Sequence, residues 1–220
     1  MNEILTCLEL QVLVLLLGAD RYFGVSDPER SLDRETLLQT VAELCRKDLL
    51  TPEEKALRLR PELRRRLTPV AFPDRVISLS APDLPQLSLY RRDGLLTLVT
   101  LLPNRAYACK LNTVTAAELM DVLEEDYLPE LASETDDAVP GVLPQVFAAD
   151  RQTLLDAVPD LRLLVECYQD QNLQYRGVIN ALAPNRPCFT TWHGGETVSR
   201  GYHKTEFETW LRSLLEETAG

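Results

Sequence analysis

The sequence has few of the residues on which common enzyme and metal chemistries depend. It contains two histidines, and its five cysteines are scattered singly, without the close pairs of a zinc or redox site. It has no Gly-rich phosphate loop, nucleophile elbow or zinc-protease helix motif, and Gly194-Gly195 is its one Gly pair. We therefore expect a non-catalytic protein without cofactor or metal, whose cysteines are small buried side chains in a reducing cytosol.

Long apolar runs are also missing. The apolar stretch 4–17 is interrupted by Glu9 and Gln11. It is shorter than the ~20 residues of a membrane span, and no basic segment precedes it. The sequence therefore predicts a soluble, cytoplasmic protein without a signal peptide and without membrane insertion.

Basic side chains are absent from one long segment, between Lys110 and Arg151. Residues 1–70 hold 11 Lys and Arg against 12 Asp and Glu, which leaves 12 against 22 for the rest of a chain whose net charge is -11. Such a surface repels phosphate backbones, so we do not expect nucleic acid as a partner of the C-terminal part. We interpret the acidic segment as a solvated helix face and loop.

Residues 1–70 are predicted to form a helical segment. The capping box of Thr6 and Glu9 predicts a helix over 7–17. A second helix is predicted over 33–47, with an apolar face at helical spacing made of Leu37, Leu38, Val41, Leu44 and Cys45. Residues 49–59 resemble a short hairpin, although Thr51 to Glu54 also fits a capping box, so a helix over 51–60 remains open. With Pro61 opening a helix through Leu67, the order resembles a winged-helix domain.

Residues 71–220 are predicted to form a duplicated body in which strands and a capped helix occur twice. Copy one covers about 76–128 and copy two about 161–216, and a Pro-rich linker with a short helix near 152–157 fills 129–160. In copy one, Asp93-Gly94 predicts a tight hairpin turn. The letters Pro-Asn-Arg recur at 103–105 and 184–186. Helices are expected to open at Thr115, with Glu118 as its capping-box partner, and at Thr205, with Glu208. The fold class is α+β, with two antiparallel sheet-plus-helix halves that pair edge to edge about a pseudo-twofold axis.

Three residues near the Gly194-Gly195 turn are candidates for contact with a partner. Trp192 stands beside the turn at a strand end, where a partly exposed Trp suits an interface. His193 and Tyr202 belong to the same hairpin. His193 and His203 could face each other across it and bind a metal ion, but such a site would need a third ligand. We therefore interpret both as ordinary hairpin histidines.

Taken together, these elements resemble the EspG family of chaperones associated with type VII secretion. The resemblance rests on Leu-Thr-x-x-Glu-Leu at 5–10, on Pro61-Glu62-Leu63, on a strand after Pro73, and on the two strand-helix halves with a Pro-rich crossing at 140–144. It implies a cytosolic, non-catalytic protein that binds helical-hairpin secreted proteins or protein pairs and keeps their apolar ends soluble. Whether the chain also forms a homodimer is left open.

A winged-helix transcription regulator is the alternative, with the duplicated body sensing a ligand or oligomerising. It depends on a basic cluster where a wing and its following helix would touch DNA, namely Arg58, Arg60, Arg64, Arg65 and Arg66. Glu53, Glu54 and Glu62 offset this cluster, which favours a solvated or intramolecular role for it.

Overall fold

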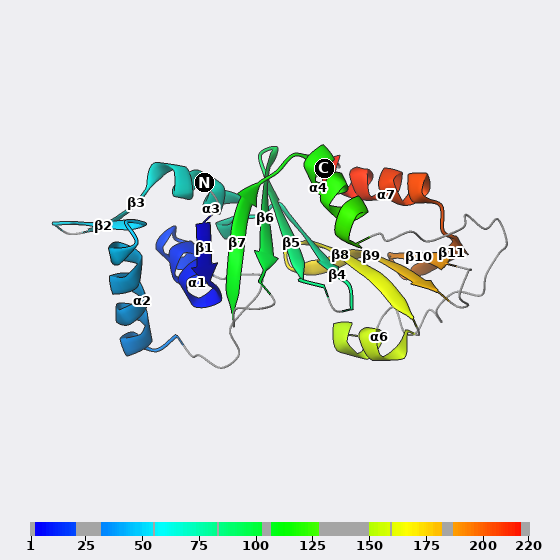
Figure 1. Ribbon diagram of the computed structural model, residues 1–220, viewed down its shortest axis with the longest axis horizontal. Coiled ribbons are helices and arrows are strands. Elements are labelled where there is room, and N and C mark those ends of the chain that lie inside the picture. The colour runs from blue at the N-terminus through cyan, green and yellow to red at the C-terminus, as the bar shows by residue number, and fades with distance from the viewer. Residues whose placement is uncertain are drawn as a thin grey trace. The chain divides into compact units, whose positions relative to one another are not determined.

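The computed structural model contains helices and antiparallel strands, which confirms the predicted α+β class. It describes residues 3–20, 32–54, 56–82, 84–102, 107–127, 150–158, 160–181 and 187–216. The chain divides into two compact units, an N-terminal unit of residues 1–74 and 87–114 and a C-terminal unit of residues 75–86 and 115–220 (Figure 1). These bounds differ from the expected ones, and the organisation into domains 1–70 and 71–220 stays a prediction.

Among the described residues of the N-terminal unit, four antiparallel strands lie side by side in the order β1-β7-β6-β5. Their bounds are Glu3–Thr6 for β1, Leu87–Arg92 for β5, Leu95–Leu101 for β6 and Ala108–Thr113 for β7. Asp93 and Gly94 both have positive φ and close the β5–β6 hairpin, as the sequence predicted. Strand β1 was not predicted because four residues directly before a helix carry too little of an alternating pattern.

Three helices and a small hairpin are the other elements of this unit in the described part of the chain. They are α1 (Cys7–Leu16), α2 (Arg34–Arg46), β2 (Leu50–Glu53), β3 (Ala56–Leu59) and α3 (Pro61–Ala71). The question of hairpin or helix over 51–60 is thus answered in favour of the hairpin. Helix α3 buries Leu63, Leu67 and Val70, and it contacts β5 and β6.

Helix α1 begins with the predicted capping box. The Glu9 backbone N–H donates to Thr6 Oγ1 at 3.0 Å, and the Thr6 N–H donates to the Glu9 carboxylate at 2.8 Å. Glu9 is buried, and Lys47 at the end of α2 balances its charge with an Nζ to Oε1 distance of 2.7 Å.

Sequence reasoning placed Leu38 on the apolar face of α2, but its side chain is 60% exposed. This prediction was wrong for Leu38, because within the described residues α2 buries only Leu44 and Thr40.

In the C-terminal unit, the strands that the structure describes are antiparallel and follow the order β4-β8-β9-β10-β11. Their bounds are Arg75–Ser80, Leu161–Gln169, Asn172–Ala181, Pro187–His193 and Glu196–Gly201. Tight turns with positive φ at both central residues join β8 to β9 at Asp170-Gln171 and β10 to β11 at Gly194-Gly195.

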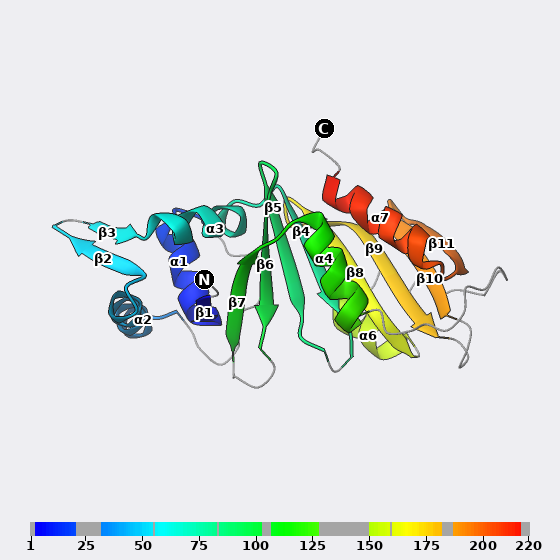
Figure 2. The same ribbon diagram turned by 45° about the horizontal axis from the view of Figure 1, so that its top comes forward.

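Helices cover both faces of this second sheet. On one face lies α7 (Lys204–Glu216), with α4 (Ala116–Val122) and the π-helical turn η1 (Leu123–Tyr127) beside it, and on the other lies α6 (Arg151–Ala157) (Figures 1 and 2). The Lys204 ammonium of α7 lies 2.9 Å from the Glu124 carboxylate of η1. The Trp210 ring of α7 packs over Gly177 of β9. On this helical side Phe189 meets the Phe207 and Trp210 rings edge-on.

Within the described residues, a hairpin, at least one further strand and a helix follow one another in each of the two predicted copies, whereas the duplication itself stays a prediction. Thr115 caps α4 with Glu118 as its partner, as predicted. Helix α7, however, begins at Lys204, so Thr205 lies within its first turn and the expected cap there was wrong. The repeated Pro-Asn-Arg letters and the acidic linker over 128–149 lie outside the described residues, and the pseudo-twofold relation stays a prediction. None of the described helices has the length and apolar character of a membrane span.

Candidate partner-binding site

The C-terminal unit contains an open groove of about 680 Å³ beside α6. We call it the α6 groove. Its lining residues come from the end of β4 and the segment after it, from α6, and from the connection of α6 to the start of β8. They are Ser80, Ala81, Pro82, Leu84, Gln86, Arg151, Leu155, Val158, Asp160, Leu161 and Arg162. A volume of this size lies within the range of about 300–1,000 Å³ that is typical of ligand pockets.

Helix α6 is fixed against the sheet because one of its sides is apolar and packs there, and its N-terminus is capped. The Asp150 carboxylate accepts from the Thr153 N–H at 3.0 Å and from the Thr153 hydroxyl at 2.7 Å. Leu154 and Val158 are buried in a cluster with three residues of the sheet, namely Leu161, Leu164 and Val178. One wall of the groove is therefore a helix held by its own core contacts.

Arg151 joins the groove to polar residues under α6. Its guanidinium donates to the Ser80 hydroxyl and lies 3.4 Å from the Ser78 hydroxyl. Its Nε also lies 3.9 Å from the Glu166 carboxylate, which is only 1% exposed. These contacts hold the Arg151 side chain against the sheet, while a third of it remains exposed to the groove.

A buried ion pair lies behind Arg151. Arg176 of β9 donates from Nε at 3.0 Å and from Nη2 at 2.6 Å to one oxygen of Glu166 of β8. The two residues are cross-strand neighbours, and both side chains are almost completely buried. Burial and the Glu166 charge raise the pKa of the nearby Tyr168 hydroxyl to about 12. Each charge in this pair depends on the other, since removal of one leaves the other desolvated.

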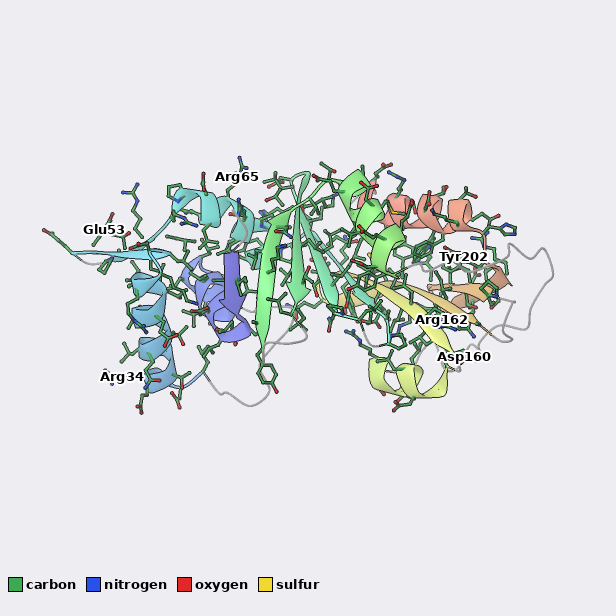
Figure 3. All side chains as sticks on the ribbon, viewed as in Figure 1. Arg34, Glu53, Arg65, Asp160, Arg162 and Tyr202 are labelled. Carbon is green, nitrogen blue, oxygen red and sulfur yellow. The ribbon has the colours of Figure 1, made fainter. Side chains whose placement is uncertain are left out.

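The rim of the α6 groove carries both signs of charge. Asp160 and Arg162 lie where α6 leads into β8, and both side chains are exposed (Figure 3). With Arg151, the lining therefore has two cations and one anion around an apolar floor. Such a surface can bind apolar side chains that have a carboxylate beside them, because the arginines supply planar donors for it.

The three predicted contact residues all lie in the C-terminal unit, but with different surroundings. Trp192 is half-buried and packs against the Leu154 cluster under α6. His193 is exposed, stacks on Tyr175 with ring centroids 4.2 Å apart, and its Nδ1 lies 3.1 Å from the Gln174 carbonyl. Tyr202 is only 4% exposed. Only His193 thus offers an exposed side chain, and the role of the three as partner contacts stays a prediction.

The two histidines do not face each other across the hairpin, an arrangement that the sequence had left possible. The Gly194-Gly195 turn pairs His193 with Glu196, whereas the backbone N–H of Tyr202 bonds to the Pro187 carbonyl at the far end. The register of an antiparallel hairpin follows from its turn, and this one places His203 beyond the last pair.

The candidate DNA-contacting arginines lie on β3 and α3 of the N-terminal unit. Arg58 is exposed on β3, and its guanidinium lies 3.4 Å from the Glu53 carboxylate. Arg60 is the N-cap residue of α3. Arg64 and Arg65 are exposed on the helix, whereas Arg66 is half-buried (Figure 3). A role of these residues in binding DNA stays a prediction.

The residues of the α6 groove were not singled out from the sequence. They come from two segments, 80–86 and 151–162, that no motif connects. The predicted helix near 152–157 was the one available signal, and it did not show which surface that helix would line.

Comparisons with known proteins bear on the fold. No known family model matches the sequence, and no curated protein matches it. Among solved structures, the chain is similar to the Mycobacterium tuberculosis type VII secretion system chaperone EspG5, solved in complex with a PE25-PPE41 dimer. The match has a TM-score of 0.54 and 12% sequence identity, and it covers 98% of this chain and 96% of that chain. The likeness therefore shows a shared fold over almost the whole length of both.

Proposed function

We propose that this chain is a cytosolic, non-catalytic chaperone-like protein of the EspG type that binds helical-hairpin secretion substrates. The observation that carries the proposal is the shared fold with EspG5 over 98% of the chain, because the matched structure is of a secretion chaperone in complex with its protein partner. The sequence resemblance to the same family was based on other features, namely capped helices and a repeated order of elements. The two lines of argument agree.

The α6 groove is our proposed place for the end of such a partner. A helical hairpin that must be kept soluble presents apolar side chains at its tip, and burying them removes them from water. Ala81, Pro82 and Leu84 on one wall and Leu155 on the other supply an apolar surface for such side chains. The arginines at the rim favour an acidic residue next to the inserted apolar ones.

The test is co-expression with small helical-hairpin proteins encoded near this gene, followed by affinity purification. The proposal predicts a stoichiometric complex that survives gel filtration. Leu84→Glu should weaken it at least about tenfold, because a charge placed in an apolar contact costs more than the 1.4 kcal/mol that tenfold represents.

Leu57→Glu is the matched control. Leu57 of β3 is 38% exposed and Leu84 is 37% exposed, so the two substitutions change similar apolar surfaces in different units. Loss of the complex with Leu84→Glu alone supports the groove. Equal loss with both variants would place the contact elsewhere, and failure to recover any complex with the unmodified chain would overturn the proposed function.

A further inference from the structure

Strand β11 is the last in the strand order of the C-terminal unit, at the end of the sheet in Figure 2, so its outer edge pairs with no other strand of the described residues. The Tyr202 N–H bonds to the Pro187 carbonyl, and Glu196 pairs with His193 across the two-residue turn. In an antiparallel pair, bonded and non-bonded residues alternate. Glu196, Val198 and Arg200 therefore direct their backbone groups towards β10, whereas Thr197 and Ser199 direct theirs outward.

The side chains of β11 that share the α7 face have an unusual symmetry. Val198 is opposite Thr191, and Arg200 is opposite Phe189. The Arg200 guanidinium lies over the Phe189 ring, 5.7 Å from its centroid. Val198 is 57% exposed, although its neighbours on the strand are polar. Glu196 lies two residues before it and Arg200 two residues after it. The strand therefore carries an anion, an apolar centre and a cation, equally spaced on one face.

We propose that β11 pairs antiparallel with β11 of a second copy of this chain, about a twofold axis at Val198. In this register Thr197 of each copy is opposite Ser199 of the other, so the outward backbone groups of both residues are satisfied on both strands. Val198 meets its own equivalent at a non-bonded pair, where side chains come closest. Glu196 of each copy is then opposite Arg200 of the other, which gives two complementary charge pairs.

The charge pattern selects this register among its neighbours. Shifting the second strand by two residues either way would place Glu196 and Arg200 opposite uncharged positions, so the two charge pairs would be lost. Exposed edge strands are usually protected from pairing by charges or proline. Here the charges have opposite signs and are symmetric about Val198, so they favour self-pairing instead of preventing it.

The surface beside β11 leaves room for the second copy. A shallow hollow of about 360 Å³ lies between β11 and α7, and small side chains of α7, Thr205, Thr209 and Ser213, line it. Arg200 also lines it, with its guanidinium 3.0 Å from the Glu206 carboxylate. In the dimer, Arg200 lies between Glu206 of its own chain and Glu196 of the second copy.

Charge reversal at these two positions tests the inference by sedimentation velocity over a range of protein concentrations. The unmodified chain is expected to dimerise reversibly. Glu196→Arg places like charges opposite each other twice in a homodimer, and so does Arg200→Glu, so each should raise the dimer Kd at least about tenfold. The double variant with both changes restores both pairs and should dimerise again.

A mixture of the two single variants provides the sharper test. A chain with Glu196→Arg has two cations, and a chain with Arg200→Glu has two anions, so only the mixed dimer has complementary pairs. Heterodimer formation from two monomeric variants supports this register. A monomeric unmodified chain, or dimers that persist in both single variants, would overturn the inference.

The result is independent of the proposed chaperone function. Residues 196 and 200 are exposed and do not line the α6 groove, so the variants should keep any partner binding. Arg200→Glu loses the contacts of Arg200 with Glu206 and Phe189 and should lower the unfolding midpoint slightly, whereas Glu196→Arg should keep the unmodified midpoint and is the variant that isolates dimerisation. An unchanged midpoint shows that lost dimerisation is not lost folding. Loss of partner binding by Leu84→Glu with dimerisation intact, or the reverse, separates the two proposals.

Discussion

Gly177→Ala is the change that tests the packing of α7 on its sheet most directly. An added Cβ at Gly177 would lie 2.8 Å from Cζ3 and 3.1 Å from Cζ2 of the Trp210 ring, closer than the 3.4–4 Å of ordinary van der Waals contact. The ring also meets Phe189 edge-on at 5.2 Å between centroids, and the Phe207 ring lies 6.0 Å away. Trp210 therefore cannot yield to a methyl group without loosening its aromatic contacts.

The expected loss of unfolding free energy follows from opposing effects. Overpacking of this kind costs about 1–3 kcal/mol, and each weakened aromatic pair adds up to about 1 kcal/mol. Alanine lowers the conformational entropy of the unfolded chain relative to glycine, which stabilises the folded state by about 0.4–1 kcal/mol where the native backbone conformation suits alanine. We expect Gly177→Ala to lower the free energy of unfolding by about 2 kcal/mol.

A double-mutant cycle with Trp210→Leu separates the clash from any other effect of alanine. Without the indole ring the added methyl meets no ring atom, so Gly177→Ala should be neutral or stabilising by up to about 1 kcal/mol in that background. The assay is urea unfolding followed by far-UV circular dichroism and by tryptophan fluorescence, since both tryptophans lie in the C-terminal unit. Equal destabilisation in both backgrounds would refute the packing argument.

Three further changes probe other parts of the structure. Arg176→Ala leaves the Glu166 carboxylate buried without its guanidinium and should cost about 3–5 kcal/mol in urea unfolding, whereas replacing both residues with apolar ones should cost much less. Glu118→Gln should destabilise the protein most near neutral pH, because the hydrogen bonds from Thr115 lower the pKa of Glu118. The stability that the carboxylate contributes is therefore present above the usual carboxyl pKa and is lost as the pH falls through the lowered pKa. The urea midpoints of the variant and the unmodified chain should differ at pH 7 and converge towards pH 3. Leu154→Ala should cost about 2–5 kcal/mol and expose α6 to proteolysis, and an unchanged cleavage pattern would count against its anchoring role.

Local features of this protein were readable from the sequence because they depend on residues close together in the chain. Thr6 and Glu9 cap α1, Thr115 and Glu118 cap α4, and each pair is three residues apart. The Asp93-Gly94 turn is equally local, since it requires only residues that adopt positive φ. Alternation predicted the strands of both copies, and helical periodicity predicted α2 but not the exposure of Leu38, because periodicity does not say what covers an apolar face.

The features that carry the two proposals depended on tertiary structure. The α6 groove joins residues about 70 positions apart in the sequence, and Arg151 meets Ser80 only because β4 pairs with β8 next to α6. The symmetric pattern of Glu196, Val198 and Arg200 in β11 is present in the sequence, but whether the outer edge of β11 pairs with another strand depends on the order of the strands in the sheet. Sequence by itself determined which elements form, since capping, turns and periodicity act over a few residues. Only tertiary structure decided which of their surfaces stay exposed, because burial is set by distant segments that come together when the chain folds.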